Sequence, residues 1–196
     1  PLTRKELLKA LYAVWPDLQC SPHVWRESAS SCIYRTDNGA ELRGVMGQRI
    51  YVLVLDAQDI KRAGAALYAR LWLAGHGRFD VSASGAFLDR NIIDGSVWQP
   101  ERLDFAGGAQ CGPGLEQRRT DPLLYNADAA FVDTRTLADL SPEEQAQLEA
   151  LKSAARETMR PASEAKQTEW VEERLKAVPN GKKKELRQLA SQYDVF

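Results

Sequence analysis

The chain has 196 residues, 44% of them hydrophobic and 27% charged, a balance that excludes an intrinsically disordered or collagen-like polymer. With 26 lysine and arginine residues against 27 aspartate and glutamate residues, the net charge is −1, so any contact with a polyanion must be local. The sequence has no apolar run of about 20 residues and no apolar signal-peptide core, so we expect a cytoplasmic protein without a membrane partner.

The first predicted elements are a helix and a hairpin. Thr3 and Glu6 have the spacing of a capping box, and apolar residues at helical intervals predict a helix that ends at Pro16. Residues 23–35 are rich in aromatic, β-branched and serine residues and lead into an Asn-Gly turn, which tolerates positive φ angles. We therefore expect a hairpin in which residues 44–55 return.

A strand, a helix and a second strand follow. The continuous apolar run 50–55 predicts a central strand that is covered on both faces. Asp56 or Asp59 can cap the next helix, which Gly75 ends. Residues 78–84 alternate between apolar and polar side chains and predict a strand with one polar face.

The character of the chain changes at Ser141, where an N-cap serine, a proline at N1 and an acid at N3 begin a helical tail. Pro161 is expected to interrupt this tail, and a turn at 179–181 to separate a last helix. The predicted class is α+β, with a mixed or antiparallel central sheet and flanking helices in residues 1–140. Residues 141–196 form the helical tail or connector.

The cysteines and histidines give little sign of a metal site. Cys20, Cys32 and Cys111 are widely spaced and odd in number, which favours free thiols. His23 and His76 lie in no zinc-binding pattern, and we expect Cys20 and His23 to be a loop thiol and a surface imidazole. Any bound metal must therefore be held by carboxylates.

Three carboxylates are candidates for such a site. Asp56 and Asp59 lie just beyond an apolar strand, where α/β folds place ligands and where two carboxylates could share a divalent ion, although helix capping would use the same residues. Asp94 follows two isoleucines, so a carboxylate is expected at the end of a buried extended segment.

A second set of polar residues is suited to phosphate oxygens. Ser28, Ser30 and Ser31 lie near Arg26 and Arg35 in the sequence and would supply hydroxyl and guanidinium donors. An exposed strand edge would use the same residue types.

The segment 82–105, SASGAFLDRNIIDGSVWQPERLDF, resembles the third catalytic motif and its surroundings in archaeo-eukaryotic primases, the primase-polymerase superfamily, in the versions carried by phages, plasmids and other mobile elements. In that family the motif is a hydrophobic residue followed by Asp, with an Arg nearby, which Ile93-Asp94 and Arg102 match. The second family motif is a Ser-x-His pair entering a central strand. Its counterpart here is the serine cluster and the strand after it, with Arg49 where the family has His.

The likeness covers residues 24–135 and has one gap. The first family motif is an Asp-x-Asp pair on a strand ahead of the serines, and no such pair occurs before residue 37. This pair could lie upstream of Pro1 in a longer protein, or Asp56 and Asp59 could replace it. In the remaining alternative the site is catalytically inactive.

The resemblance implies a DNA replication protein of a mobile element with a primase-like, RRM-like core. Its activity would be nucleotidyl transfer with Mg²⁺ or Mn²⁺ on a DNA template, with nucleoside triphosphates as substrates and a helicase domain or protein as a further partner. The implied metal ligand is Asp94, joined by Asp56 and Asp59. The implied contacts of the triphosphate are Arg49, Ser28, Ser30, Ser31 and Arg102, with Arg49 and Asp94 as the catalytic residues.

Two other functions remain open. The chain could be a non-catalytic module that binds nucleic acid or joins a replication protein to its helicase through the helices after Ser141. Alternatively, it could be a nuclease in which Asp56, Asp59 and Asp80 hold the metal ion, and it would then degrade DNA without needing nucleotides.

Overall fold

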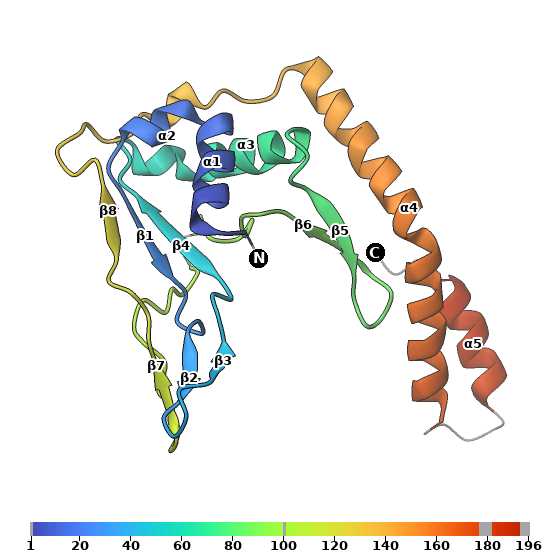
Figure 1. The fold of residues 1–196 in the computed structure, drawn as a ribbon. Coiled ribbons are helices and arrows are strands. Elements are labelled where there is room, and N and C mark those ends of the chain that lie inside the picture. Colours follow the sequence, from blue (N-terminus) through green and yellow to red (C-terminus); the bar gives the residue numbers. More distant parts are fainter. Residues whose placement is uncertain (1, 100, 177–181, 193–196) are drawn as a thin grey trace. The chain divides into compact units, whose positions relative to one another are not determined.

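The computed structural model describes residues 2–99, 101–176 and 182–192, and the chain forms two units (Figure 1). The first unit combines Pro1–Leu67 with Gly95–Asp139, and the second combines Tyr68–Asp94 with Leu140–Phe196. Helices and antiparallel strands are both present, which confirms the predicted α+β class with a C-terminal helix. The sequence pattern assigns Tyr68–Asp94 to the amino-terminal domain, whereas the structure groups this segment with the tail.

Two helices begin the first unit. Helix α1 spans Arg4–Val14, and its predicted capping box is confirmed: Thr3 Oγ1 accepts a hydrogen bond from the Glu6 N–H, and the Glu6 carboxylate accepts one from the Thr3 N–H. Helix α2 spans Pro16–Cys20. Pro16 ends α1 because it cannot continue its hydrogen bonds, and it opens α2 because the first helical position needs no N–H.

Two antiparallel sheets follow in the described part of this unit, with strand orders β4-β1-β8 and β3-β2-β7. The strands are β1 (His23–Glu27), β2 (Ile33–Arg35), β3 (Glu41–Arg43), β4 (Gln48–Val52), β7 (Leu115–Gln117) and β8 (Leu123–Tyr125). The predicted hairpin is confirmed, because β1 pairs with β4 and β2 pairs with β3 on either side of the turn.

The prediction that residues 50–55 form a central strand covered on both faces was wrong. Strand β4 lies at the edge of its sheet and β1 at the centre. Helix α1 covers only the face of β1 that carries His23 and Trp25, as the contacts of Tyr12 and Arg4 with these rings show (Figure 1). Leu53 is 52% exposed, so the apolar run does not reflect burial on two sides.

Helix α3 spans Ile60–Leu73 and runs from the first unit into the second. A short 3-10 helix, η1 (Ala57–Asp59), precedes it, and the Asp56 side chain caps η1 by accepting the N–H of Gln58 at 2.9 Å. Gly75, at φ +82°, follows the end of α3 in the left-handed conformation that suits glycine. The capping role predicted for Asp56 is therefore confirmed.

The second unit packs a hairpin against helices. Strands β5 (Arg78–Val81) and β6 (Phe87–Arg90) pair antiparallel, and helices α4 (Pro142–Leu175) and α5 (Lys183–Gln192) follow. Trp72, Phe79 and Leu148 form the buried centre of this unit. Among the described helices, none combines the length and the apolar composition needed to cross a membrane.

Helix α4 begins with the predicted capping box at Ser141 but does not break at Pro161, so the expected interruption was wrong. Two contacts hold the helix beyond this proline against the hairpin: the Ser163 hydroxyl donates to the Gly85 carbonyl, and Lys166 Nζ donates to the Val81 carbonyl at 3.2 Å. Tertiary contacts on the following turns therefore offset the hydrogen bond that proline removes. The predicted turn at 179–181 lies outside the described residues.

Candidate nucleic-acid interface

Two arginines face each other on the sheet of the first unit. Arg26 on β1 lies directly opposite Arg49 on β4 in the antiparallel register. Side chains in such positions are neighbours, and two like charges placed there repel each other. The Nε atoms of both arginines are buried, and neither has a hydrogen-bond partner among the described residues. The pair therefore has two buried N–H donors that lack an acceptor in the part of the chain that the structure describes.

This arginine pair lies on the face of the sheet that α1 does not cover. Along β1, His23, Trp25 and Glu27 are buried, whereas the alternate residues Val24 and Arg26 are half-buried on the opposite face. The neighbours of Val24 in the register, Tyr51 and Leu124, are 38% and 61% exposed. An aromatic ring and aliphatic side chains thus adjoin the two guanidinium groups on an accessible surface.

Asp104 already places a carboxylate on Arg49. The two side chains form an ion pair through Arg49 Nη1, and the Tyr51 hydroxyl donates to Asp104 Oδ2. Asp104 belongs to the exposed segment 101–110, and its side chain is 35% exposed. This face of the sheet therefore accepts an oxyanion at Arg49.

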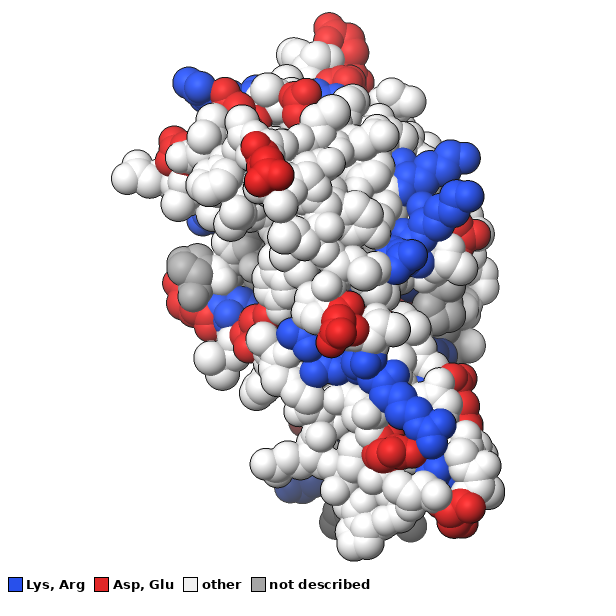
Figure 2. All heavy atoms as spheres, turned by 60° about the vertical axis from the view of Figure 1, so that its left-hand side comes forward, with Lys and Arg blue, Asp and Glu red and all other residues white. Residues whose placement is uncertain are grey.

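Lysine and arginine side chains also gather locally on the surface. Figure 2 shows many of them at the upper right and in a diagonal band below, with other basic and acidic side chains scattered over the same view. A chain of net charge −1 can thus present basic patches to a polyanion.

The structure brings the three predicted serines together, but their side chains differ in how accessible they are. Ser31 is 0% exposed; its hydroxyl accepts the N–H of Met46 at 3.1 Å and lies 2.9 Å from Ser28 Oγ. Ser30 is exposed and lies 3.3 Å from Ser28 Oγ. Ser31 therefore stabilises the connection between the strands, and its buried side chain is not accessible to a ligand. Ser28 and Ser30 lie next to it, the first half-buried and the second exposed.

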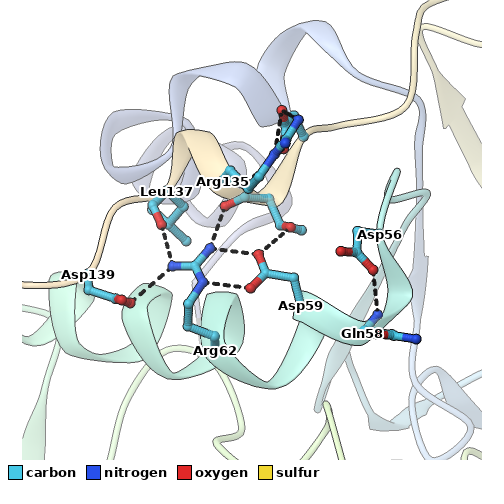
Figure 3. Close-up of polar contacts among 9 residues, drawn as sticks. Asp56, Gln58, Asp59, Arg62, Arg135, Leu137 and Asp139 are labelled. Atoms are coloured by element: carbon cyan, nitrogen blue, oxygen red, sulfur yellow. Dashed lines mark hydrogen bonds and ion pairs between the residues drawn. The ribbon is translucent and has the colours of Figure 1, made fainter.

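Asp59, a predicted metal ligand, is engaged by an arginine (Figure 3). Its two carboxylate oxygens accept Arg62 Nε at 2.6 Å and Nη2 at 2.7 Å, and the Thr134 hydroxyl donates to Oδ2 at 2.5 Å. Arg62 also donates to the carbonyls of Thr134 and Leu137 and to the Asp139 carboxylate. The cluster fastens the start of α3 to residues 134–139, which gives Asp59 a structural role.

We expect this cluster to make the first unit sensitive to acid. Hydrogen bonds from Arg62 and then Thr134 lower the pKa of Asp59 from its ordinary 3.8 to about 2. Because the folded-state pKa lies below the unfolded one, the stabilisation is complete above about pH 4 and is lost as the pH falls towards 2. Thermal unfolding between pH 2 and pH 5 tests this: the change should be smaller in Asp59→Asn. An identical pH profile in both chains would contradict it.

Asp94 does not lie at the end of a strand, so the expectation of a carboxylate at the end of a buried extended segment was wrong. Strand β6 ends at Arg90, and Asn91 then bonds the carbonyl of Tyr68 and the N–H of Ile92, which takes the chain out of the ladder. Asp94 is exposed in irregular structure and belongs to the second unit, whereas Arg49 and the serines belong to the first.

The remaining predicted residues are Arg102 in the first unit and Asp80 in the second. Arg102 is exposed in segment 101–110 of the first unit. Asp80, named for the nuclease alternative, pairs with Arg78 and Arg90 in the second unit. Among the described residues, no three histidine, cysteine, aspartate or glutamate side chains come together in a group that could hold a metal ion.

Two expectations for the cysteines and histidines had different outcomes. All three cysteines are free, as predicted. His23 is 1% exposed and packs inside the first unit, so its assignment as a surface imidazole was wrong. It begins a central strand, and the chain pattern alone did not show that α1 covers it.

Sequence reasoning named Arg26 and Arg49 but missed that they oppose each other. A signal was present: Arg26 precedes Asp37 by as many positions as Arg49 follows Asn38, and Asp37 and Asn38 lie at the predicted turn. Counting outward from that turn would have paired them. Tyr51 and Asp104 were missed because their roles depend on tertiary contacts.

Comparison with protein-family models, curated proteins and solved structures gives no match for this chain.

Proposed function

We propose that the chain is a nucleic-acid-binding module of a DNA replication protein and that Arg26 and Arg49 hold the phosphate backbone. The observation that carries this proposal is the pair of buried Nε–H donors on directly opposed strands, which have no acceptor among the described residues. A phosphate group would accept both donors and neutralise the repulsion between the two guanidinium groups. Tyr51, exposed beside the pair, offers a ring on which a base can stack.

The resemblance of residues 82–105 to primases of mobile elements supports the replication setting. It also gives a second candidate, primase-like nucleotidyl transfer with Mg²⁺ or Mn²⁺ on a DNA template, with a helicase as a further partner. Arg49 suits this candidate equally well, because its Nε–H donor, which has no partner among the described residues, can bind a triphosphate as well as a backbone phosphate. Asp94 would then be the metal ligand and Arg102 a further phosphate contact.

One experiment separates the functions. The chain is incubated with primed and unprimed single-stranded DNA, nucleoside triphosphates and Mn²⁺, and both DNA retention and products are followed. The binding module predicts retention with no product, and Asp94→Asn should leave retention unchanged. Extension that Asp94→Asn abolishes would establish nucleotidyl transfer, degradation without nucleotides would establish a nuclease, and absence of retention would contradict the binding proposal.

The ion pair of Asp104 makes a further prediction. Asp104 occupies Arg49 with an anion, so Asp104→Asn should raise the affinity for single-stranded DNA by about 3- to 10-fold at low salt, because a competing charge is removed. Fluorescence anisotropy with a labelled oligonucleotide measures this. Asp121→Asn, which removes an exposed charge elsewhere in the first unit, is the matched control. An unchanged or weaker affinity in Asp104→Asn would show that the carboxylate does not compete.

A further inference from the structure

An open pocket of about 720 Å³ lies between α1 and the end of β8 in the first unit. Arg4, Lys5 and Lys9 line it together with Tyr12, Tyr125 and Asn126, and no carboxylate side chain of a described residue lines it. This volume is in the range of small-molecule sites, which span roughly 300–1,000 Å³. Cations with aromatic rings suit an anion that has a flat apolar part.

The two tyrosines of the pocket are held in place by a buried histidine. His23 Nδ1 lies 2.8 Å from the carbonyl of Ser21, which can only accept, so Nδ1 carries the proton. Nε2 therefore accepts the hydroxyl of Tyr12 at 2.7 Å. Tyr125 stacks on the imidazole with ring centroids 4.7 Å apart and planes at 5°. Asn126 ties the end of β8 to the carbonyl of Gln19. The aromatic lining is thus fixed before any ligand arrives.

The lysines of the pocket lack the acidic partners that surface lysines often have. Lys5 and Lys9 are exposed and one turn apart on α1, so they lie on the same side of the helix and repel each other. Neither forms an ion pair or a side-chain hydrogen bond with another described residue. Glu6, the acid of this turn, is bound in the capping box with Thr3. An anionic ligand would relieve this repulsion.

We propose that this pocket binds a nucleoside phosphate, with the base against the tyrosines and the phosphate at Lys5 and Lys9. The ligand is a free nucleotide or the phosphorylated end of a nucleic-acid strand, since both carry the same groups. This site is distinct from the arginine pair. Alternation along β1 places His23, which holds the pocket tyrosines, on the opposite face of the sheet from Arg26.

The test is a titration with AMP, inorganic phosphate, and an eight-nucleotide oligothymidylate with and without a 5′-phosphate. We expect Lys5→Gln/Lys9→Gln to weaken AMP or phosphorylated-end binding at least tenfold. The control Lys61→Gln/Lys184→Gln removes two exposed lysines elsewhere and should change it less than twofold. Equal losses in the two variants, or no binding of AMP and the phosphorylated strand by the unaltered chain, would overturn the proposal.

Two further arms identify the ligand and separate this site from the arginine pair. Tyr125→Leu should weaken AMP binding but leave inorganic phosphate unchanged, with the circular dichroism spectrum as the check on folding; equal affinities for AMP and phosphate in the unaltered chain would contradict a role for the rings. In the Arg26→Gln/Arg49→Gln variant, which lacks the proposed backbone contacts, tighter binding of the phosphorylated strand than of both the unphosphorylated strand and AMP identifies a strand end, and tighter binding of AMP identifies a free nucleotide. AMP or strand-end binding should persist in Arg26→Gln/Arg49→Gln. Loss of this binding in that variant would contradict the proposal that the pocket is separate from the arginine pair.

Discussion

Replacing both arginines of the sheet, Arg26→Gln/Arg49→Gln, should weaken the binding of single-stranded DNA by about 100-fold or more, because each of the two charge-assisted hydrogen bonds that are lost contributes about 1.5–3 kcal/mol and 1.4 kcal/mol is a factor of ten. The loss should shrink as salt is added, since the contacts release counterions from the backbone. Fluorescence anisotropy at several salt concentrations measures both effects.

The control for this variant is Arg43→Gln/Lys61→Gln, which removes two exposed positive charges from the same unit and should change the affinity less than threefold. The arginine variant should fold at least as well as the unaltered chain, because it removes a repulsion between opposed strands and, among the described residues, one partly exposed ion pair, that of Arg49 with Asp104. An equal loss of affinity in the two variants would show that DNA binding depends on the net charge of the chain and not on the arginine pair.

The second large effect concerns the stability of the second unit. Trp72→Ala should lower its free energy of unfolding by about 4 kcal/mol, because truncating a buried tryptophan leaves a cavity. Trp72 is 4% exposed, its ring lies 5.5 Å from that of Phe79, and its Nε1 donates to Asp89 at 2.8 Å. Trp72→Phe keeps most of the packing and loses the hydrogen bond to the charged Asp89 carboxylate, for which we expect about 1.5–3 kcal/mol.

Hydrogen exchange of residues 78–90 reports the opening of this unit. Asp89 also accepts the Tyr68 hydroxyl and Lys152 Nζ, each at 2.8 Å, so the tryptophan belongs to a polar cluster as well as to the core. Burial raises the pKa of Asp89, but the donors Lys152, Trp72 and Tyr68 outweigh it and hold this pKa below its ordinary value. Protection in Trp72→Ala equal to that of the unaltered chain would show that this core does not stabilise the hairpin.

Local chemistry accounts for what the sequence predicted correctly. The capping boxes at Thr3 and Ser141 depend on residues three positions apart, and the hairpin depends on its Asn-Gly turn and the strands beside it. The serine cluster was found for the same reason. These features are encoded within a few residues and form in the way that their spacing indicates.

The errors concern features that depend on distant parts of the chain. The run 50–55 lies at an edge because β8 pairs with β1 and not with β4, and the burial of His23 depends on α1. Pro161 stays within α4 because of contacts with the hairpin, some 75 to 85 residues earlier in the chain. Asp94 misses the expected strand end because Asn91 bonds α3. No periodicity in the sequence reports such contacts.

The most direct test of the arginine pair is the NMR signal of its Nε–H groups during titration with single-stranded DNA. Both donors lack an acceptor in the described structure, so a phosphate that reaches them forms new hydrogen bonds. We predict that the Arg26 and Arg49 Nε–H resonances, assigned from the single Arg→Gln variants, move downfield in step with binding while that of Arg43 stays in place. Saturation of the chain with DNA while both resonances remain unmoved would contradict the account.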